Sequence, residues 1–269
     1  MIAEFVERVA VVTGGASGIG KAMAVAFRDL GMRVVIADIE EAALNHTANE
    51  LGVTGVHTDV TDPDSVQQLA NTVVERFGTC DLLLNNAGVG GTGRLTDQTL
   101  HDWNWVIDVN LRGVIHVLHA FLPVMLANPS NTHIVNTSSI AGLGAFVSAP
   151  YTATKYAVVG ISESMRHELA DTTVGVSVLC PGFVNTNLAA SDRNRPGHLA
   201  NSDSPRRKPN RGLLETTKLS FIEPESVAHS VVKAVLNDEF WIITDTSLLA
   251  LTLPRAGELS NIALGGAAQ

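Results

Sequence analysis

The 269-residue sequence predicts an α/β fold, a doubly wound parallel sheet with helices on both faces. Two observations lead to this prediction. Short apolar runs alternate with longer segments of helical periodicity, which is the order of strand–helix–strand units. Several runs, such as RVVIAD at residues 33–38, are almost continuously apolar, which is typical of strands covered on both faces. The length suits a single domain with one sizeable core.

The predicted elements follow one another in strict alternation. Strands are expected at residues 8–13, 33–38, 52–59, 80–86, 133–139, 174–182 and 240–244. Helices are expected near residues 18–30, 40–51, 63–77, 98–127, 151–170 and 224–237. Pro63 and Pro224 suit the first turns of their helices, where the missing N–H has no intrahelical partner to lose.

Residues 187–220 interrupt this alternation. They are rich in Asn, Ser, Pro and charged residues, and they form too long a stretch for an ordinary connection. We therefore expect a substrate-binding lid at about 187–220. The basic cluster RRKPNR, residues 206–211, lies within it and is predicted to be a solvated loop.

Composition narrows the classes of partner and compartment. The formal net charge of −9 disfavours nucleic acid and anionic membrane surfaces as partners. Cys80 and Cys180 lie far apart beside apolar runs, which predicts buried free thiols in a reducing compartment. The N-terminus does not resemble a signal peptide, and no uninterrupted apolar run reaches the ~18 residues of a bilayer span. A cytoplasmic protein is expected, and no metal site is predicted.

A glycine-rich segment, TGGASGIG at residues 13–20, follows the first strand and opens the first helix. Gly14, Gly18 and Gly20 lack a Cβ, so the backbone there can turn tightly and approach a pyrophosphate closely. The helix N-terminus adds free N–H groups and the positive end of the helix dipole. In this strand–turn–helix context the segment predicts a dinucleotide site.

Asp38 ends the second strand, where an acidic residue can accept hydrogen bonds from the hydroxyls of an adenosine ribose. Its carboxylate would repel a 2′-phosphate. Ile39 follows where a phosphate-binding enzyme would carry Arg, and Gly15 supplies no cation either. Both features favour NAD over NADP. The alternative is that Asp38 only caps the helix that begins near Glu40.

Tyr151 and Lys155 are four residues apart in a predicted helix, so they share one helix face. A free tyrosine with a pKa near ~10 is a poor base at neutral pH. A neighbouring ammonium favours the phenolate and should lower that pKa. The pair is therefore a candidate device for proton transfer.

Six segments occur in one order: TGGASGIG (13–20), NNAG (85–88), DVNLRG around Asn110, SSIAG (138–142), YTATK (151–155) and PGFVNT (181–186). Together they resemble the short-chain dehydrogenase/reductase family, over about residues 5–190. The resemblance implies one Rossmann-type domain with a seven-stranded parallel sheet. It also implies an NAD(P)-dependent oxidoreductase that interconverts secondary alcohols and ketones.

The resemblance implies a role for each matching position. Tyr151 is expected to be the acid/base, and Lys155 to support it and bind the nicotinamide ribose. Asn110 is expected to kink its helix and hold a water that links Lys155 to solvent. Asp59 and Val60 should contact the adenine, residues 86–88 should support the adenosine side, and the PGFVNT segment should hold the carboxamide. The expected dinucleotide contacts are Gly14, Ser17, Gly18, Ile19, Gly20, Asp38, Ile39, Asp59, Val60, Asn86, Ala87, Gly88, Tyr151, Lys155, Pro181, Gly182, Val184 and Thr186.

The catalytic serine is either Ser138 or Ser139. The family's usual spacing of thirteen residues before the tyrosine points to Ser138, whereas the local pattern Ser-x-Ala-Gly points to Ser139. A strand end constrains side-chain direction while a loop absorbs a deletion, so Ser139 is preferred. Neighbouring side chains on a strand alternate, so both cannot face the cofactor equally.

The substrate is the least specified part. We expect an apolar pocket, suited to a small apolar or aromatic alcohol or ketone. Its lining should come from Leu143, Phe146, Val147 and the segment from Leu188 onward. The alternative is that these side chains only pack the loop. The apolar segment SLLALTLPRA near the C-terminus is expected to form a subunit interface or a pocket wall. Family members are commonly homotetramers or dimers, with the helix at residues 151–170 packed across an axis.

Two other functions compete with this interpretation. A 3-oxoacyl thioester reductase could meet a phosphopantetheine carrier through RRKPNR, but such enzymes usually use NADPH, which Asp38 disfavours. A non-catalytic dinucleotide-binding sensor on the same fold would have no need of the complete Ser/Tyr/Lys/Asn set.

Overall fold

The computed structural model describes residues 2, 4–91, 93–145, 147–200 and 220–265. Seven parallel strands form one sheet in the order β3-β2-β1-β4-β5-β6-β7. The strands are β1 (Val9–Thr13), β2 (Arg33–Asp38), β3 (Thr54–His57), β4 (Leu82–Asn85), β5 (Thr132–Thr137), β6 (Val174–Cys180) and β7 (Trp241–Ile243). The predicted doubly wound fold and all seven predicted strands are confirmed, with ends that differ by at most two residues.

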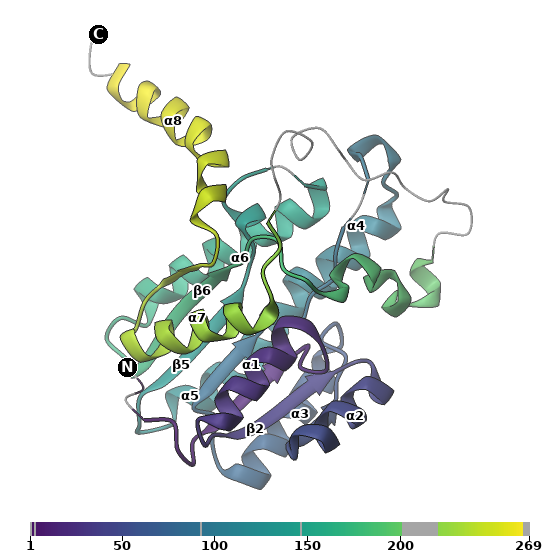
Figure 1. Ribbon diagram of the computed structural model, residues 1–269, viewed down its shortest axis with the longest axis vertical. Helices are drawn as coiled ribbons and strands as arrows, with labels where there is room; N and C mark the ends of the chain where they lie inside the picture. Colours follow the sequence, from purple (N-terminus) through teal and green to yellow (C-terminus); the bar gives the residue numbers. More distant parts are fainter. Residues whose placement is uncertain (1, 3, 92, 146, 201–219, 266–269) are drawn as a thin grey trace.

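The helices cover both faces of the sheet (Figure 1). Those on one face are α1 (Gly18–Asp29), α2 (Glu41–Leu51) and α7 (Pro224–Asn237). Those on the other are α3 (Pro63–Phe77), α5 (Gly113–Leu126) and α6 (Ala149–Glu168), with α4 (Leu100–Ile107) packed against α6. Strand residues alternate between the two layers: Val11 packs with α5, whereas Val12 packs with α1. This alternation explains why the strands read as continuously apolar.

The predicted helix at residues 98–127 is interrupted. A π-helical turn, η2 (Asp108–Arg112), separates α4 from α5. Asn110 lies within this turn and is fully buried. Turns of this kind locally widen a helix and are frequent at functional sites. The expected kink therefore takes the form of a π turn.

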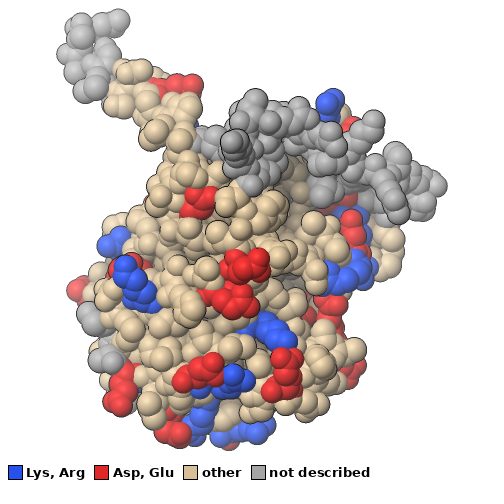
Figure 2. All heavy atoms as spheres, viewed as in Figure 1, with Lys and Arg blue, Asp and Glu red and all other residues tan. Residues whose placement is uncertain are grey.

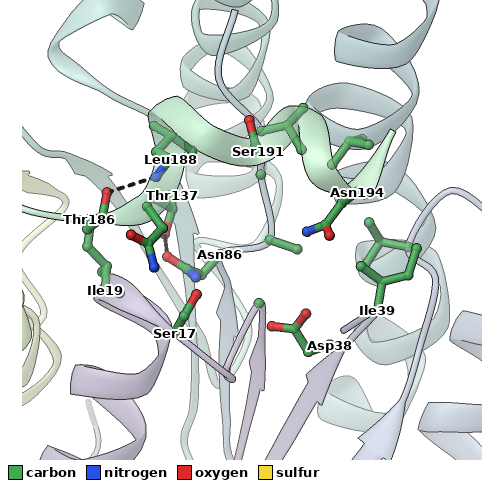
Figure 3. Close-up of a pocket in the computed structure, with 18 of the residues that line it drawn as sticks. Ser17, Ile19, Asp38, Ile39, Asn86, Thr137, Thr186, Leu188, Ser191 and Asn194 are labelled. Carbon is green, nitrogen blue, oxygen red and sulfur yellow. Dashed lines mark hydrogen bonds between the residues drawn. The ribbon is translucent and has the colours of Figure 1, made fainter. Parts of the chain in front are cut away.

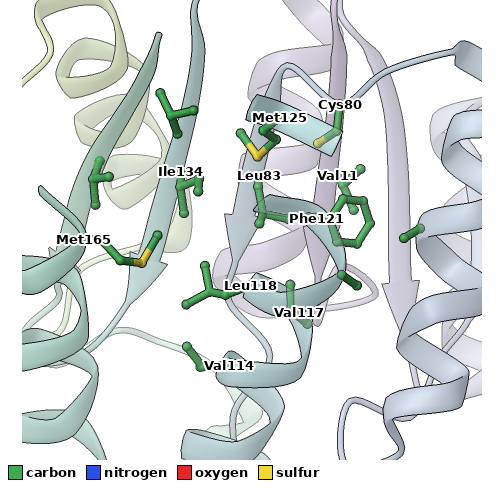
Figure 4. Packing of buried hydrophobic residues seen from close by; sticks show 14 of the residues in the cluster. Val11, Cys80, Leu83, Val114, Val117, Leu118, Phe121, Met125, Ile134 and Met165 are labelled. Carbon is green, nitrogen blue, oxygen red and sulfur yellow. The ribbon is translucent and has the colours of Figure 1, made fainter. Parts of the chain in front are cut away.

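The run Leu100–Leu126, which comprises α4, η2 and α5, is long and apolar enough on average to span a membrane. It contains no uninterrupted apolar run of that length, because charged and polar residues divide it. In the fold, Val117, Phe121 and Met125 are fully buried against the sheet, as Figure 4 shows. The apolar residues of α5 within this run therefore belong to the core of the domain.

Helix α8 (Leu253–Gly265) was not expected from the sequence, which indicated only a short apolar segment there. It projects from the body of the domain, as the ribbon in Figure 1 and the space-filling view in Figure 2 show. Its contact with the body includes the Arg255 guanidinium, which lies 5.1 Å from the centre of the Tyr156 ring on α6. The preceding turn, η6 (Thr246–Leu251), is closer in: Leu248 is buried beside Ile140. The turn packs against the body of the domain, and the expected role of this segment as a subunit interface or a pocket wall stays a prediction.

Both cysteines are buried free thiols, as predicted. Cys80 precedes β4 and packs among the side chains drawn in Figure 4, and burial raises the pKa of its thiol well above the usual range. Cys180 ends β6, and burial raises the pKa of its thiol to about 12. Neither thiol forms a reactive thiolate near neutral pH.

His133 in β5 is fully buried. Its Nε2 lies 2.7 Å from the Ser177 Oγ, and that hydroxyl donates to the Glu239 carbonyl. Because the single Ser177 hydrogen is already used, Nε2 must carry the imidazole proton. Nδ1 then presents a lone pair, 3.5 Å from Asp238 Oδ1, with no hydrogen-bond partner among the described residues. Burial lowers the pKa of His133 to about 4, and the Asp238 carboxylate offsets this only in part.

This imidazole should make stability depend on pH. The folded pKa lies below the unfolded value of 6.5, so the unfolded chain binds the extra proton between pH 4 and 6.5. The contribution is therefore complete above pH 6.5 and is lost as pH falls. We expect about 2 kcal/mol of unfolding free energy to be lost between pH 7 and pH 5 through His133. Denaturant melts at pH 7 and pH 5 measure this loss in the native chain and in His133→Gln, which keeps a donor toward Ser177. The loss should be smaller in the variant by this amount. An equal loss in both proteins would contradict the assignment.

Candidate active site

The site is a cleft at the carboxyl ends of the strands, with a volume of about 1270 Å³ when the space open to solvent is counted. It lies where the strand order reverses, since β1 leads to β2 on one side and pairs with β4 on the other. Ligands of open α/β sheets bind at this switch point. Figure 3 shows the turn that carries Ser17 and the end of β2 with Asp38 on one side, and a short helix with Leu188, Ser191 and Asn194 on the other.

The glycine-rich turn is held to its shape by close contacts. Gly14 has a φ of +65°, and a Cβ there would lie 2.9 Å from the Ala87 Cα. A Cβ on Gly20 would lie 2.0 Å from the Gly14 carbonyl oxygen, so only glycine allows α1 to begin this close to the turn. Ser17 is the N-cap residue of α1, and its side chain makes no capping bond. The hydroxyl and the N-terminus of this 12-residue helix are thus available to an anion in the cleft.

Asp38 joins the end of β2 to this turn. Its carboxylate accepts hydrogen bonds from the backbone N–H groups of Ala16, at 3.0 Å, and Glu40, at 3.1 Å. Burial raises the pKa of this carboxyl, although the backbone donors oppose the shift. The N-cap of α2 is Glu40, so the alternative interpretation of Asp38 as that cap is wrong. The Ile39 side chain is exposed at the mouth of the cleft.

The floor of the cleft depends on Thr13, the last residue of β1. Its hydroxyl oxygen accepts from the N–H groups of Asn86, at 2.9 Å, and Ala87, at 3.0 Å. The Asn86 amide donates back to the Thr13 carbonyl at 3.1 Å. Farther along, the Asp59 carboxylate accepts from the N–H and hydroxyl of Thr61. These bonds hold the NNAG turn and the end of β3 against the cleft.

The two serines have different surroundings. Ser138 is buried, and its hydroxyl donates to the Lys155 carbonyl at 2.7 Å. Ser139 caps the short helix η3 (Ile140–Gly142) by accepting from the Ala141 N–H at 3.1 Å. Its hydroxyl also lies close enough to the Tyr151 phenol to lower the pKa of that group. Ser139 therefore faces the phenol, whereas Ser138 braces the backbone of α6.

Tyr151 and Lys155 share one face of α6, with the Lys155 Nζ 5.6 Å from the centre of the Tyr151 ring. Nζ donates to the Thr137 carbonyl at 2.9 Å. Burial lowers the pKa of Lys155 to about 8. Burial also raises the pKa of Tyr151, a shift that Ser139 offsets in part. The expectation of a lowered tyrosine pKa is thus wrong for the protein alone, because burial raises that pKa more than the hydrogen bond with Ser139 lowers it.

Asn110 holds the loop after β4. Its amide nitrogen donates to the Val89 carbonyl at 2.9 Å, and its amide oxygen accepts from the Val89 N–H at 2.8 Å. The side chain is therefore committed to this loop. The expected water link through Asn110 stays a prediction.

The sequence-predicted residues converge on the cleft. All of them line it except Gly20, which packs behind the turn, and Asn110, which lies behind Val89. Of the predicted substrate contacts, Leu188 lines the cleft, whereas Leu143 and Val147 pack around Ile140 and Leu248. Phe146 and residues 206–211 lie outside the described residues. Cleft residues that the sequence did not indicate are Ala37, Glu40, Thr58, Val89, Trp105, Val109 and Thr137. Asn187, Ser191, Arg193 and Asn194 also line the cleft, and they fall within the segment predicted as a lid.

The residues fit a nicotinamide dinucleotide. The glycine turn packs tightly against the NNAG turn, the adjoining helix N-terminus is open to a pyrophosphate, and a carboxylate stands at the ribose position after β2. At the opposite end, Ser139, Tyr151 and Lys155 form a cluster suited to proton transfer.

Comparisons with known proteins agree with this geometry. Residues 8–197 match the family model described as short chain dehydrogenase. A short chain dehydrogenase/reductase from Burkholderia phymatum, solved in complex with NAD, is 40% identical with a TM-score of 0.90, over 97% of this chain and 96% of that one. An actinorhodin polyketide ketoreductase variant with NADPH is 32% identical with a TM-score of 0.77, over 92% of this chain and 99% of that one.

Among proteins of described function, the C alpha-dehydrogenase of Sphingobium sp. strain SYK-6 is 34% identical over 247 residues, 89% of this chain and 81% of that protein. Together with the family match and the seven-stranded sheet, this assigns the chain: it belongs to the short-chain dehydrogenase/reductase family of oxidoreductases.

Proposed function

We propose that the protein is an NAD-dependent dehydrogenase that interconverts a secondary alcohol and a ketone, with Tyr151 as the acid/base. The observation that carries this proposal is the placement of the Tyr151 phenol between the Ser139 hydroxyl and Lys155, in the same cleft as the Asp38 carboxylate. NAD, when bound, would supply the hydride acceptor. The proposal is supported by the names of two relatives, a dehydrogenase and a ketoreductase, which describe the oxidation and the reduction direction of such a reaction.

The residues of the chain supply the proton chemistry. Ser139 and Tyr151 would hydrogen-bond the reacting oxygen, and the Tyr151 oxygen would take its proton during oxidation. With a pKa of about 8, Lys155 is mostly protonated at pH 7, so its charge opposes the burial that disfavours a tyrosinate. The Asn110 backbone, on the π turn behind Val89, is the proposed start of a water-mediated path to solvent. In the reverse direction the tyrosine would return the proton to the ketone oxygen.

The cleft walls support an apolar substrate. Val89, Trp105 and Leu188 line the cleft and offer mostly hydrocarbon surface. We propose a small apolar or aromatic alcohol or ketone, held under a lid that the structure describes over residues 187–200.

Removing the phenolic proton tests the assignment of the acid/base. Tyr151→Phe keeps the ring, so we expect turnover to fall by at least ~100-fold with NAD affinity nearly unchanged, since general acid–base catalysis contributes about this much. The measurement is the absorbance of reduced nicotinamide against a panel of secondary alcohols and ketones. Near-native turnover in the variant would overturn the mechanism.

The two serines give a matched pair of variants. Ser139→Ala should lower turnover by about 100-fold, because it removes a donor to the reacting oxygen. Ser138→Ala should reduce turnover much less and mainly lower the free energy of unfolding by about 1 kcal/mol, because it removes a buried hydrogen bond. Steady-state kinetics and thermal melts of both variants separate the two effects. The opposite ranking of turnover would make Ser138 the catalytic hydroxyl.

Cofactor selectivity should follow the charge at position 38. We expect kcat/KM to favour NAD over NADP by ~100-fold or more, since about 2.8 kcal/mol suffices. Asp38→Ala with Ile39→Arg should shift the ratio toward NADP, because arginine offers several donors to a phosphate. Asp38→Asn is the control, since it removes the charge but keeps an acceptor for the Glu40 N–H. Native preference for NADP, or an unchanged ratio in the double variant, would contradict the assignment.

A further inference from the structure

The segment at residues 187–199, here called the strap, crosses the mouth of the cleft. It contains the short helices η4 (Asn187–Asn194) and η5 (Gly197–Leu199). Leu188 lines the cleft near its start, and Arg193 and Asn194 line it at the end where Asp38 lies. Figure 3 shows Asn194 reaching from this helix toward Asp38 and Ile39. The strap thus bridges the reactive end and the adenosine end of the cleft.

One side of the strap is fixed by well-buried contacts. The Arg195 guanidinium pairs with Asp102 of α4 at 2.8 Å and lies 4.5 Å from the centre of the Trp105 ring. The Arg195 and Asp102 side chains are only 12% and 4% exposed. The Ser191 hydroxyl oxygen accepts from the Gly90 N–H at 2.9 Å. These contacts anchor the strap to α4 and to the loop after β4.

The other side is held through one carboxylate, that of Glu40. The Arg193 guanidinium donates to both Glu40 oxygens, with the Nε bond at 3.1 Å. The Asn194 amide adds a third bond at 2.9 Å. Arg193 also donates to the Ala190 carbonyl at 2.9 Å, which orients its guanidinium within the strap. Glu40 directly follows Ile39 at the end of β2, so these bonds close the cleft over its adenosine end.

The two sides differ in their exposure to water. The Arg193 and Glu40 side chains are 38% and 28% exposed, far more than the Arg195–Asp102 pair. A partly exposed ion pair contributes about 1 kcal/mol or less and is weakened by salt, although a two-pronged arginine geometry places it at the upper end. The Glu40 side is therefore where the strap opens first.

We propose that Arg193 is a positioning residue for the dinucleotide: through its ion pair with Glu40 it fastens the strap over the adenosine end of the cleft and slows dinucleotide release. The proposal rests on the proposed function, because it requires that the cleft bind NAD or NADH. Arg193 is separated from Glu40 by 153 positions in the sequence, so the pairing arises only in the fold.

The test is the rate of NADH release, followed by the fluorescence of bound NADH in stopped flow after an excess of NAD is added. Arg193→Gln and Glu40→Gln should each raise the release rate about five-fold, as expected for the loss of about 1 kcal/mol. The double variant should release NADH no faster than either single variant, because both substitutions break the same pair. The native rate should rise between 50 and 500 mM salt, and the rate of Arg193→Gln should not.

Glu50→Gln is the matched control. It removes another exposed carboxylate, which pairs with Lys21 at 2.8 Å away from the cleft, and should leave the release rate unchanged. Thermal melts of all variants check that the strap variants remain folded. Unchanged release in both single variants, or additive effects in the double variant, would overturn the proposal. If the native chain binds no NADH, the proposed function fails instead, which keeps the two outcomes distinct.

Discussion

The bonds between Thr13 and the NNAG turn are the constraint on which the site depends. β1 and β4 are neighbours in the sheet, and the Thr13 hydroxyl and carbonyl tie their carboxyl ends together through Asn86 and Ala87. This tie fixes the glycine-rich turn, since Gly14 sits directly against the Ala87 backbone. The two turns thus form a fixed floor for the cleft. The carboxyl ends of β2, β5 and β6 add further lining residues beside it.

Burial then sets the chemistry of the groups at the other end. Lys155, Tyr151 and Cys180 are enclosed by the sheet and α6, and removal from water pushes each toward its neutral form. Burial lowers the lysine pKa only to about 8, so the ammonium remains mostly charged at neutral pH. Burial raises the tyrosine pKa, and only added positive charge or hydrogen bonding can lower that pKa again. The enclosed lysine therefore matters as a fixed charge beside the phenol, and the protein alone does not hold a tyrosinate.

Much of the site could be predicted because its chemistry is carried by short contiguous stretches. The glycine turn, Asp38 and the Tyr151/Lys155 pair each follow from residue type and local spacing, and the choice of Ser139 followed from the local pattern Ser-x-Ala-Gly. The residues that were missed, such as Trp105 and Val109, reach the cleft from segments whose place is set by tertiary packing. The shift of the Tyr151 pKa was missed for the same reason, since it depends on burial from several elements. Helix α8 has apolar residues but no capping pattern that separated it from a loop.

The central position of β1 also has a consequence for synthesis. Asn86 follows Thr13 by 73 positions, so β1 leaves the ribosome long before the strand that completes its pairing. During that interval β1 can pair with β2, but its other edge remains an open row of backbone donors and acceptors flanked by apolar side chains. Such an edge is a site for mispairing between nascent chains. The same tie that shapes the cleft therefore leaves β1 dependent on prompt synthesis of β4 or on chaperone protection until residue 85 has been made.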